Sequence, residues 1–216
     1  LARRSIDASS AWFWRSRAVL DGADGRYHIR DVVGPDEYTE HVDDNAYTNW
    51  MAKTCVDTAL ALFSGDGGAT EFSGALGASA GRLEIEGRLS ALREFSARLY
   101  VPEPRADGVL PQDASFLTLP EVDVASYRAA ERKQAILHDF SREEINKRQI
   151  LKQADAVMLL FLRPELFPRA VMEATYRYYE CRSVHDSSLS PAIHAAVAAR
   201  LGLMDEAYTR FVEARE

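Results

Sequence analysis

The sequence predicts an all-α fold, and three features of the 216-residue chain indicate it. Apolar residues recur at three- and four-residue spacing through most of the chain, which is the spacing of one helix face. A tight helix–helix turn lies at 201–205, where Gly202 ends one helix and Asp205 starts the next. Long polar loops separate other helices. Short turns and long loops together predict stacked helical hairpins, in a toroid or a bundle, with the long loops collected at one end.

The predicted helices have recognisable start signals. Asp44 or Asn45 can cap a helix that begins at residue 45. Ser141 and Glu144 have the spacing of a capping box in front of a long apolar run. Taken in chain order, the predicted helices span 2–20, 45–63, 83–99, 142–162, 168–181, 190–201 and 204–215.

The segments between these helices carry turn and loop chemistry. A short strand is predicted within 27–33, and residues 108–112 are also strand-like. Residues 64–74 are rich in glycine and predict a linker. Residues 102–120 hold four prolines, and a loop of that length inside a compact domain is usually functional or mobile. Residues 121–138 are predicted to be helical in parts.

Composition narrows the class of protein. The net charge is −7, which argues against a nucleic-acid partner or an anionic membrane partner. The longest apolar runs, such as 156–162, are too short to span a bilayer. Cys55 and Cys181 lie far apart in helical patterns and predict free thiols in a reducing compartment. We therefore expect a cytoplasmic protein. Because the chain lacks a starting Met and opens inside a predicted helix, we expect a fragment.

The most informative stretch is the acidic loop at 33–49. Gly34, Pro35 and Asp36 predict a tight turn, which can hold the carboxylate of Glu37 in one direction, as a general acid requires. Acidic loops are more often solvated turns that end in a helix cap. The mixture of side chains that can bind sugar hydroxyls favours a site here: Tyr38, His41, Asn45, Tyr47 and Asn49.

The same loop offers possible metal ligands in Glu37, Glu40, His41 and Asp43. Their spacing fits neither a calcium-binding EF-hand loop nor the two-histidine zinc motif on a helix. The sequence therefore predicts no metal.

Two further polar clusters are candidates for binding. Lys152, Gln153 and Asp155 interrupt the apolar part of the helix predicted at 142–162, and they can lie at its wet end or point into a polar cavity. In the segment 183–191, serines and His185 gather at a predicted helix start, where free N–H groups favour an anion. Either Ser190 caps that helix, with Pro191 as its first residue, or an earlier serine does. An ordinary cap needs fewer polar residues than this segment provides.

The remaining signals are weaker. Residues 112–116 (Gln-Asp-Ala-Ser-Phe) can line a pocket or form plain loop. The sequence contains no Gly-rich phosphate loop, no nucleophile elbow and no CxxC motif. His28, His138 and His194 have no convincing partners in the sequence and are interpreted as structural.

Three of these motifs, in this order and spacing, resemble glycoside hydrolase family 65. They are Gly34–Tyr38 with Val42–Asn49, then Lys152–Asp155, then His185–Ser190. The family includes maltose, trehalose, kojibiose and nigerose phosphorylases. The resemblance runs through nearly the whole chain. It implies the later part of an (α/α)6 barrel, and hence that the N-terminal β-sandwich, the early barrel helices and the C-terminal β domain of family members lie outside residues 1–216.

The resemblance also implies a reaction and its residues. It implies inverting phosphorolysis of an α-glucosidic disaccharide to β-glucose 1-phosphate and an acceptor sugar. Glu37 would be the general acid, Lys152 and Gln153 would bind substrate, and His185, Ser187 and Ser188 would bind phosphate. No cofactor is implied beyond inorganic phosphate as co-substrate. A homodimer of the full-length protein is a further expectation.

This chemistry agrees with the residues themselves. An inverting hydrolase needs one carboxylic acid and one carboxylate base, whereas phosphate is already an anionic nucleophile and needs no base. One well-held acid and one anion site are then sufficient. Asp44, where the family usually has Asn, and the differing loop 110–119 leave the acceptor sugar open. An inverting hydrolase of the same family and a non-catalytic sugar-binding helical domain remain alternatives.

Overall fold

The computed structural model describes residues 2–63, 82–128 and 135–215, with side chains omitted at 2–7 and 82–85. The chain divides into two compact units, residues 1–30 with 48–101, and residues 31–47 with 102–216. The glycine-rich linker predicted at 64–74 lies outside the described residues. Within the described residues, no helix is both long enough and apolar enough to cross a membrane.

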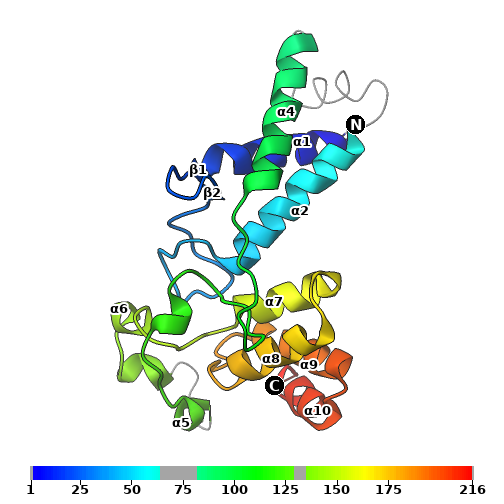
Figure 1. The fold of residues 1–216 in the computed structure, drawn as a ribbon. Coiled ribbons are helices and arrows are strands. Elements are labelled where there is room, and N and C mark those ends of the chain that lie inside the picture. The colour runs from blue at the N-terminus through cyan, green and yellow to red at the C-terminus, as the bar shows by residue number, and fades with distance from the viewer. Residues whose placement is uncertain (1, 64–81, 129–134, 216) are drawn as a thin grey trace. The chain divides into compact units, whose positions relative to one another are not determined.

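The first unit consists mainly of helices with one small hairpin (Figure 1). Its helices are α1 (Ala2–Arg17), most of α2 (Ala46–Leu62) and α4 (Arg82–Arg98). Strands β1 (Val19–Leu20) and β2 (Tyr27–His28) pair antiparallel. The buried ring of Tyr27 packs edge-on against that of Phe95, with 5.3 Å between centroids. The apolar face of α4 is thereby fixed against the hairpin.

The second unit is helical (Figure 1). Its helices α7 (Asp155–Leu162), α8 (Arg169–Glu180) and α9 (Leu189–Leu201) pack against one another, and α10 (Met204–Glu213) packs against α9. The turn between α9 and α10 contains Gly202 at a φ of 78°, a left-handed conformation that favours glycine. This confirms the predicted helix–helix turn. The elements are η1 (Phe116–Thr118), α5 (Ala125–Arg128), η2 (Ala135–His138), α6 (Arg142–Ile145), α7 (Asp155–Leu162), η3 (Pro164–Leu166), α8 (Arg169–Glu180), α9 (Leu189–Leu201) and α10 (Met204–Glu213).

The helix predicted over 142–162 is wrong as a single element. Its capping box is present, because Ser141 and Glu144 bond to each other's backbone N–H, but α6 ends at Ile145. The backbone beyond it pairs with distant segments instead. Gln149 N donates to Pro120 O at 2.9 Å, and Leu151 pairs with Ser183. Helix α7 starts only at Asp155, so the 146–154 segment is a loop.

The strand predictions need smaller corrections. The predicted first helix ends at Arg17, and Val19–Leu20 is a strand. The strand expected within 27–33 is confined to Tyr27–His28, followed by an isolated bridge from Val32 to Val42. Residues 108–112 form no strand, because Leu110 N donates to the Thr175 hydroxyl of α8 instead of to another strand.

Candidate active site

Within the acidic loop, residues from Asp36 to Thr39 form a turn, which a 3.3 Å hydrogen bond from Thr39 N to Asp36 O closes. Asp36 itself is fully buried, and Glu37 is exposed. The Asp36 side chain accepts bonds from Tyr38 N at 3.3 Å and from the Thr39 hydroxyl at 2.6 Å. The turn therefore holds the Glu37 backbone while leaving its carboxylate at the surface.

The same Asp36 carboxylate reaches the second candidate cluster. Its Oδ1 accepts a 2.9 Å bond from Lys152 N and a longer one, 3.5 Å, from Gln153 N. In return, Asp36 N donates to Asp155 Oδ1 at 2.6 Å. Hydrogen bonds therefore join the Asp36–Thr39 turn to the loop before α7.

Asp155 is the other buried acid that takes part in these hydrogen bonds. Its Oδ2 accepts from Asn45 Nδ2 at 2.7 Å, and its N–H donates to the Gln112 side chain at 3.0 Å. A Cβ on Gly34 would lie 1.9 Å from Asp155 Oδ2, so only glycine fits there. Burial raises the pKa of the Asp36 and Asp155 carboxyls, and the charge of Asp36 raises the pKa of Asp155 further. These acids are structural centres of the site.

Glu37 is paired with Lys152. The Lys152 ammonium donates to Glu37 Oε2, and the lysine side chain is only 16% exposed. The hydrogen bond from Lys152, together with its charge, lowers the pKa of Glu37. A general acid needs a proton to give, so this pairing alone does not prepare Glu37 for that role. Lys152 faces an anion instead of bulk water.

Gln153 joins the same turn from the other side. Its Nε2 donates to Pro35 O, and a pocket is lined in part by Pro35, Gln153, Ser190 and His194. The loop before α7 and the start of α9 both contribute residues to the lining of this pocket. Three of the motifs singled out in the sequence therefore meet in this unit.

The serine-rich segment forms the N-terminus of α9. Ser188 occupies the N-cap position and Pro191 lies within the first turn, as in the second of the two alternatives. The Ser188 hydroxyl makes no capping bond and its side chain is exposed. Ser187 Oγ accepts from Leu189 N at 3.3 Å. The Ser187 hydroxyl is therefore engaged within the helix start, whereas the Ser188 hydroxyl is exposed.

His185 points inward. Its ring nitrogens lie 2.8 Å from Ser190 Oγ and 3.4 Å from the Arg128 guanidinium, and its φ is 57°. Burial lowers the pKa of His185 to about 4, so the ring is neutral at pH 7. Both ring nitrogens already have protein neighbours, so contact with phosphate through this ring requires a rearrangement.

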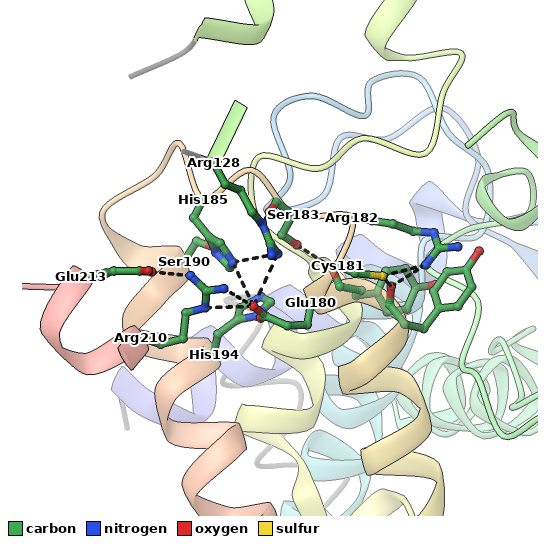
Figure 2. A network of polar contacts seen from close by, with 12 residues as sticks. Arg128, Glu180, Cys181, Arg182, Ser183, His185, Ser190, His194, Arg210 and Glu213 are labelled. Atoms are coloured by element: carbon green, nitrogen blue, oxygen red, sulfur yellow. Dashed lines mark hydrogen bonds and ion pairs between the residues drawn. The ribbon is translucent and has the colours of Figure 1, made fainter. Parts of the chain in front are cut away.

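The inward side of His185 belongs to a network around Glu180 at the end of α8 (Figure 2). Glu180 bonds to His194 Nδ1, and Arg210 Nε donates to Glu180 Oε1 at 2.9 Å. Arg128 approaches the same oxygen at 3.4 Å. Bonds and charges from the two histidines lower the pKa of Glu180 despite its burial. Glu180 is thus an anion held by several donors.

Two of the histidines without convincing partners in the sequence have partners in the structure. His194 bonds to Glu180, and His28, which lies outside this network, pairs with Asp24 at 3.1 Å. Glu180 gave no sequence signal, because its partners on α9 and α10 are distant in the chain. Residues Glu180, His185 and His194 have possible ligand atoms within 4.8 Å of one another.

The weak cluster at 112–116 is structural. Asp113 Oδ1 accepts from Ser115 N and Phe116 N, both at 2.8 Å, and so starts η1. Gln112 Oε1 accepts from the first N–H of α7 at Asp155. These contacts fix the long loop beside the loop that carries Lys152.

Helices with loop-borne acids and a serine-rich helix start match a carbohydrate-active catalytic domain. The sequence profile of the glycosyl hydrolase family 65 central catalytic domain matches residues 8–216, and the chain belongs to this family. Kojibiose phosphorylase of Escherichia coli (strain K12) is 47% identical over 207 residues, 96% of this chain and 25% of that protein. The α,α-trehalose phosphorylase of Thermoanaerobacter brockii is 33% identical over 205 residues, 94% of this chain and 26% of that protein.

A solved structure supports the same assignment. A putative kojibiose phosphorylase from human microbiome has a TM-score of 0.83 and 27% identity, covering 97% of this chain and 28% of that one. The predicted fold class, part of a helical (α/α) barrel, is confirmed. The chain spans about a quarter of the length of the curated relatives it matches.

Proposed function

We propose that the enzyme carrying this chain is an inverting glycoside phosphorylase that cleaves an α-glucosidic disaccharide with inorganic phosphate. The observation that carries the proposal is the exposed Glu37 carboxylate held by Lys152, in the unit that also contains the outward-facing Ser188. In the proposed reaction, Glu37 gives a proton to the glycosidic oxygen as the C1–O bond breaks. A phosphate oxygen bonds to C1 from the opposite face, which yields β-glucose 1-phosphate and the acceptor sugar.

Lys152 links phosphate binding to the protonation of Glu37. In the unliganded state Lys152 lowers the pKa of Glu37, so the group is a carboxylate. An incoming phosphate competes for the ammonium group. Loss of the Lys152 bond removes the main cause of the lowered pKa, and Glu37 can then take up the proton that it delivers. We propose that Lys152 and Gln153 contact the glucosyl unit and phosphate together.

The phosphate subsite is proposed at the start of α9. The hydroxyl groups of Ser187 and Ser188 supply donors, and the positive end of the helix dipole favours an anion. His185 contributes through its backbone or after its ring leaves Ser190. Replacing Ser188 with Ala should therefore raise the KM for phosphate more than the KM for the sugar.

A hydrolase of the same family is the second candidate, and the serine-rich anion site argues against it. A hydrolase needs a carboxylate that can activate water. Asp36 and Asp155 are fully buried, and each accepts hydrogen bonds from protein groups. Neither is therefore placed to serve as that base.

The test is phosphate-dependent sugar release by the full-length enzyme. Maltose, trehalose, kojibiose and nigerose are offered with and without phosphate, and glucose 1-phosphate is measured. A phosphorylase releases it only with phosphate, a hydrolase releases glucose without phosphate, and a binding domain releases nothing.

The acid is tested in the same assay. Glu37→Gln should lower kcat by about 10³-fold or more, because an amide cannot donate the proton. Glu40→Gln is the matched control, since Glu40 lies in the same loop with a side chain that is 43% exposed. Near-normal turnover of Glu37→Gln would refute the assignment.

A further inference from the structure

A small pocket lies beside the turn that carries Glu37. Its lining includes Pro35 and Gln153, Met158 from α7, and Ser190, Ile193 and His194 from α9. Its cavity volume is about 10 Å³, which is room for one water-sized group. That is below the usual size of a site for a whole ligand, so the pocket suits one part of a bound molecule.

Two buried acceptor atoms in this pocket lack a partner among the described residues. They are Gln153 Oε1 and His194 Nε2. The orientation of the Gln153 amide is defined, because its Nε2 donates to Pro35 O. His194 is only 1% exposed, so its Nε2 is not solvated from another side. A buried polar atom without a partner costs free energy and indicates a missing one.

The Glu180 network determines what His194 offers. The Glu180 carboxylate takes the hydrogen on Nδ1 of His194, which leaves a lone pair on Nε2 (Figure 2). Glu180 also faces Arg128 and Arg210.

The acceptor lone pairs of these two pocket residues select the chemistry of the occupant. A phosphate oxygen would meet acceptors and be repelled, whereas a hydroxyl group can donate its hydrogen. A metal ion at Glu180, His185 and His194 is disfavoured, because Arg128 and Arg210 already neutralise the carboxylate.

We propose that this pocket binds a hydroxyl group of the glucosyl unit, with His194 as a specificity-determining residue. The inference rests on the proposed phosphorolysis. His194 Nε2 accepts the one hydrogen of the hydroxyl, and Glu180 acts as a positioning residue that fixes the His194 tautomer. The apolar side chains of Met158 and Ile193 exclude water from the bond, which strengthens it.

Two replacements of His194 separate its proposed bond to the substrate hydroxyl from its bond to Glu180. The amide N–H of His194→Asn stands where Nδ1 stands and keeps the bond to Glu180, but the variant loses the pocket acceptor. His194→Gln places an amide oxygen near Nε2 and loses the Glu180 bond. The full-length enzyme is assayed in the synthetic direction with β-glucose 1-phosphate and its 2-, 3-, 4- and 6-deoxy analogues.

With β-glucose 1-phosphate, His194→Asn should lower kcat/KM about tenfold, the usual size of one lost hydrogen bond in a buried site. Wild type should reject one deoxy analogue by about the same factor. With that analogue, His194→Asn should show no further loss, because the partner hydroxyl is already gone. His194→Gln should keep more of the discrimination against that analogue than His194→Asn does.

Equal loss with all analogues would overturn the inference, because it indicates a structural role only. A crystal structure of wild type with β-glucose 1-phosphate gives the second test, which holds even if a variant fails to fold. A hydroxyl oxygen within hydrogen-bond distance of His194 Nε2 supports the inference, and a phosphate oxygen or water there overturns it. Should the enzyme lack phosphorolysis, calorimetric binding of glucose and the deoxyglucoses tests the pocket separately.

Discussion

Two buried acidic centres in the same unit are compensated in different ways. Around Asp36 and Asp155, the recorded bonds come from uncharged donors: backbone N–H groups, a hydroxyl and an amide. Around Glu180, the donors include two guanidiniums and two imidazoles. Burial raises the pKa of both aspartates, whereas the pKa of Glu180 is lowered. In this protein the neutral donors do not offset the desolvation of the aspartates, whereas the donors around Glu180, which include cations, do offset its desolvation.

The difference gives each centre its own role. The Asp36–Asp155 pair ties the turn before Glu37 to the loop before α7 and so fixes two segments of the candidate site. The Glu180 centre fixes side chains instead, since it orients His194 and limits the freedom of His185. The first centre therefore controls where the proposed acid stands, and the second controls what the pocket accepts.

The largest expected effect is that of Glu180→Gln. The change leaves Arg128 and Arg210 without their shared carboxylate, and breaking a buried ion pair in this way costs about 3 kcal/mol or more. The free energy of unfolding is measured by urea denaturation. Glu173→Gln on the same helix is the control, because its pair with Arg177 is exposed and should cost at most about 0.5 kcal/mol. Equal losses in the two variants would contradict the comparison.

Gly34→Ala should have the next largest effect. Its Cβ would meet Asp155 Oδ2 at 1.9 Å and Asn45 Nδ2 at 2.8 Å, so the turn must shift. Overpacking of this kind costs about 1–3 kcal/mol, and the displacement of Glu37 should also lower kcat. Gly22→Ala is the control, because nothing lies within 4 Å of its added Cβ. Unchanged kcat and stability in Gly34→Ala would show that the turn does not depend on this approach.

Local signals predicted the helices well, and their failures have a clear cause. Gly202 and the Ser141–Glu144 capping box act through neighbours in the chain, and both are present as predicted. The 142–162 helix was wrong because Leu151 bonds to backbone at 182–184, far away in sequence. Apolar periodicity cannot distinguish a buried loop from a helix when the loop's bonds are long-range.

The site was predictable only in part for the same reason. The turn at Glu37 and the lysine at 152 stand out as motifs, and the structure pairs them. The bond from Asp36 to Asp155 joins residues 119 positions apart, and no local pattern announces it. His194 sits in an apolar helix, and only the packing of α8 on α9 supplies its partner. Contacts of this kind follow from tertiary packing.

The pH dependence of stability should separate the two centres. A carboxyl with a raised folded pKa, such as Asp36, stabilises the fold at pH below its unfolded pKa, and this stability is lost as pH rises through the folded pKa. Glu180 has a lowered folded pKa, so its contribution is present above its unfolded pKa and is lost as pH falls.

Between about pH 4 and 6, Asp36→Asn should therefore make stability rise more with pH than in wild type. Below about pH 4.5, Glu180→Gln should make stability rise less with pH than in wild type. Each slope should change by at most about 1.4 kcal/mol per pH unit, the limit for one proton. Urea denaturation at several pH values measures the slopes. Changes of the same sign in both variants would show that the two centres do not differ in protonation.

The smallest expected effect is that of Asp155→Asn. If burial keeps this carboxyl protonated, the change replaces one neutral group with another of the same shape. The Asn oxygen still accepts from Asp36 N, and only the bond with Asn45 is lost, at a cost of about 1 kcal/mol. Asp155→Ala is the contrast, because it leaves both donors unpaired and should cost about 2–3 kcal/mol. A loss of about 3 kcal/mol or more for Asp155→Asn would mean that Asp155 is a compensated anion like Glu180, and the contrast between the two centres would then fail.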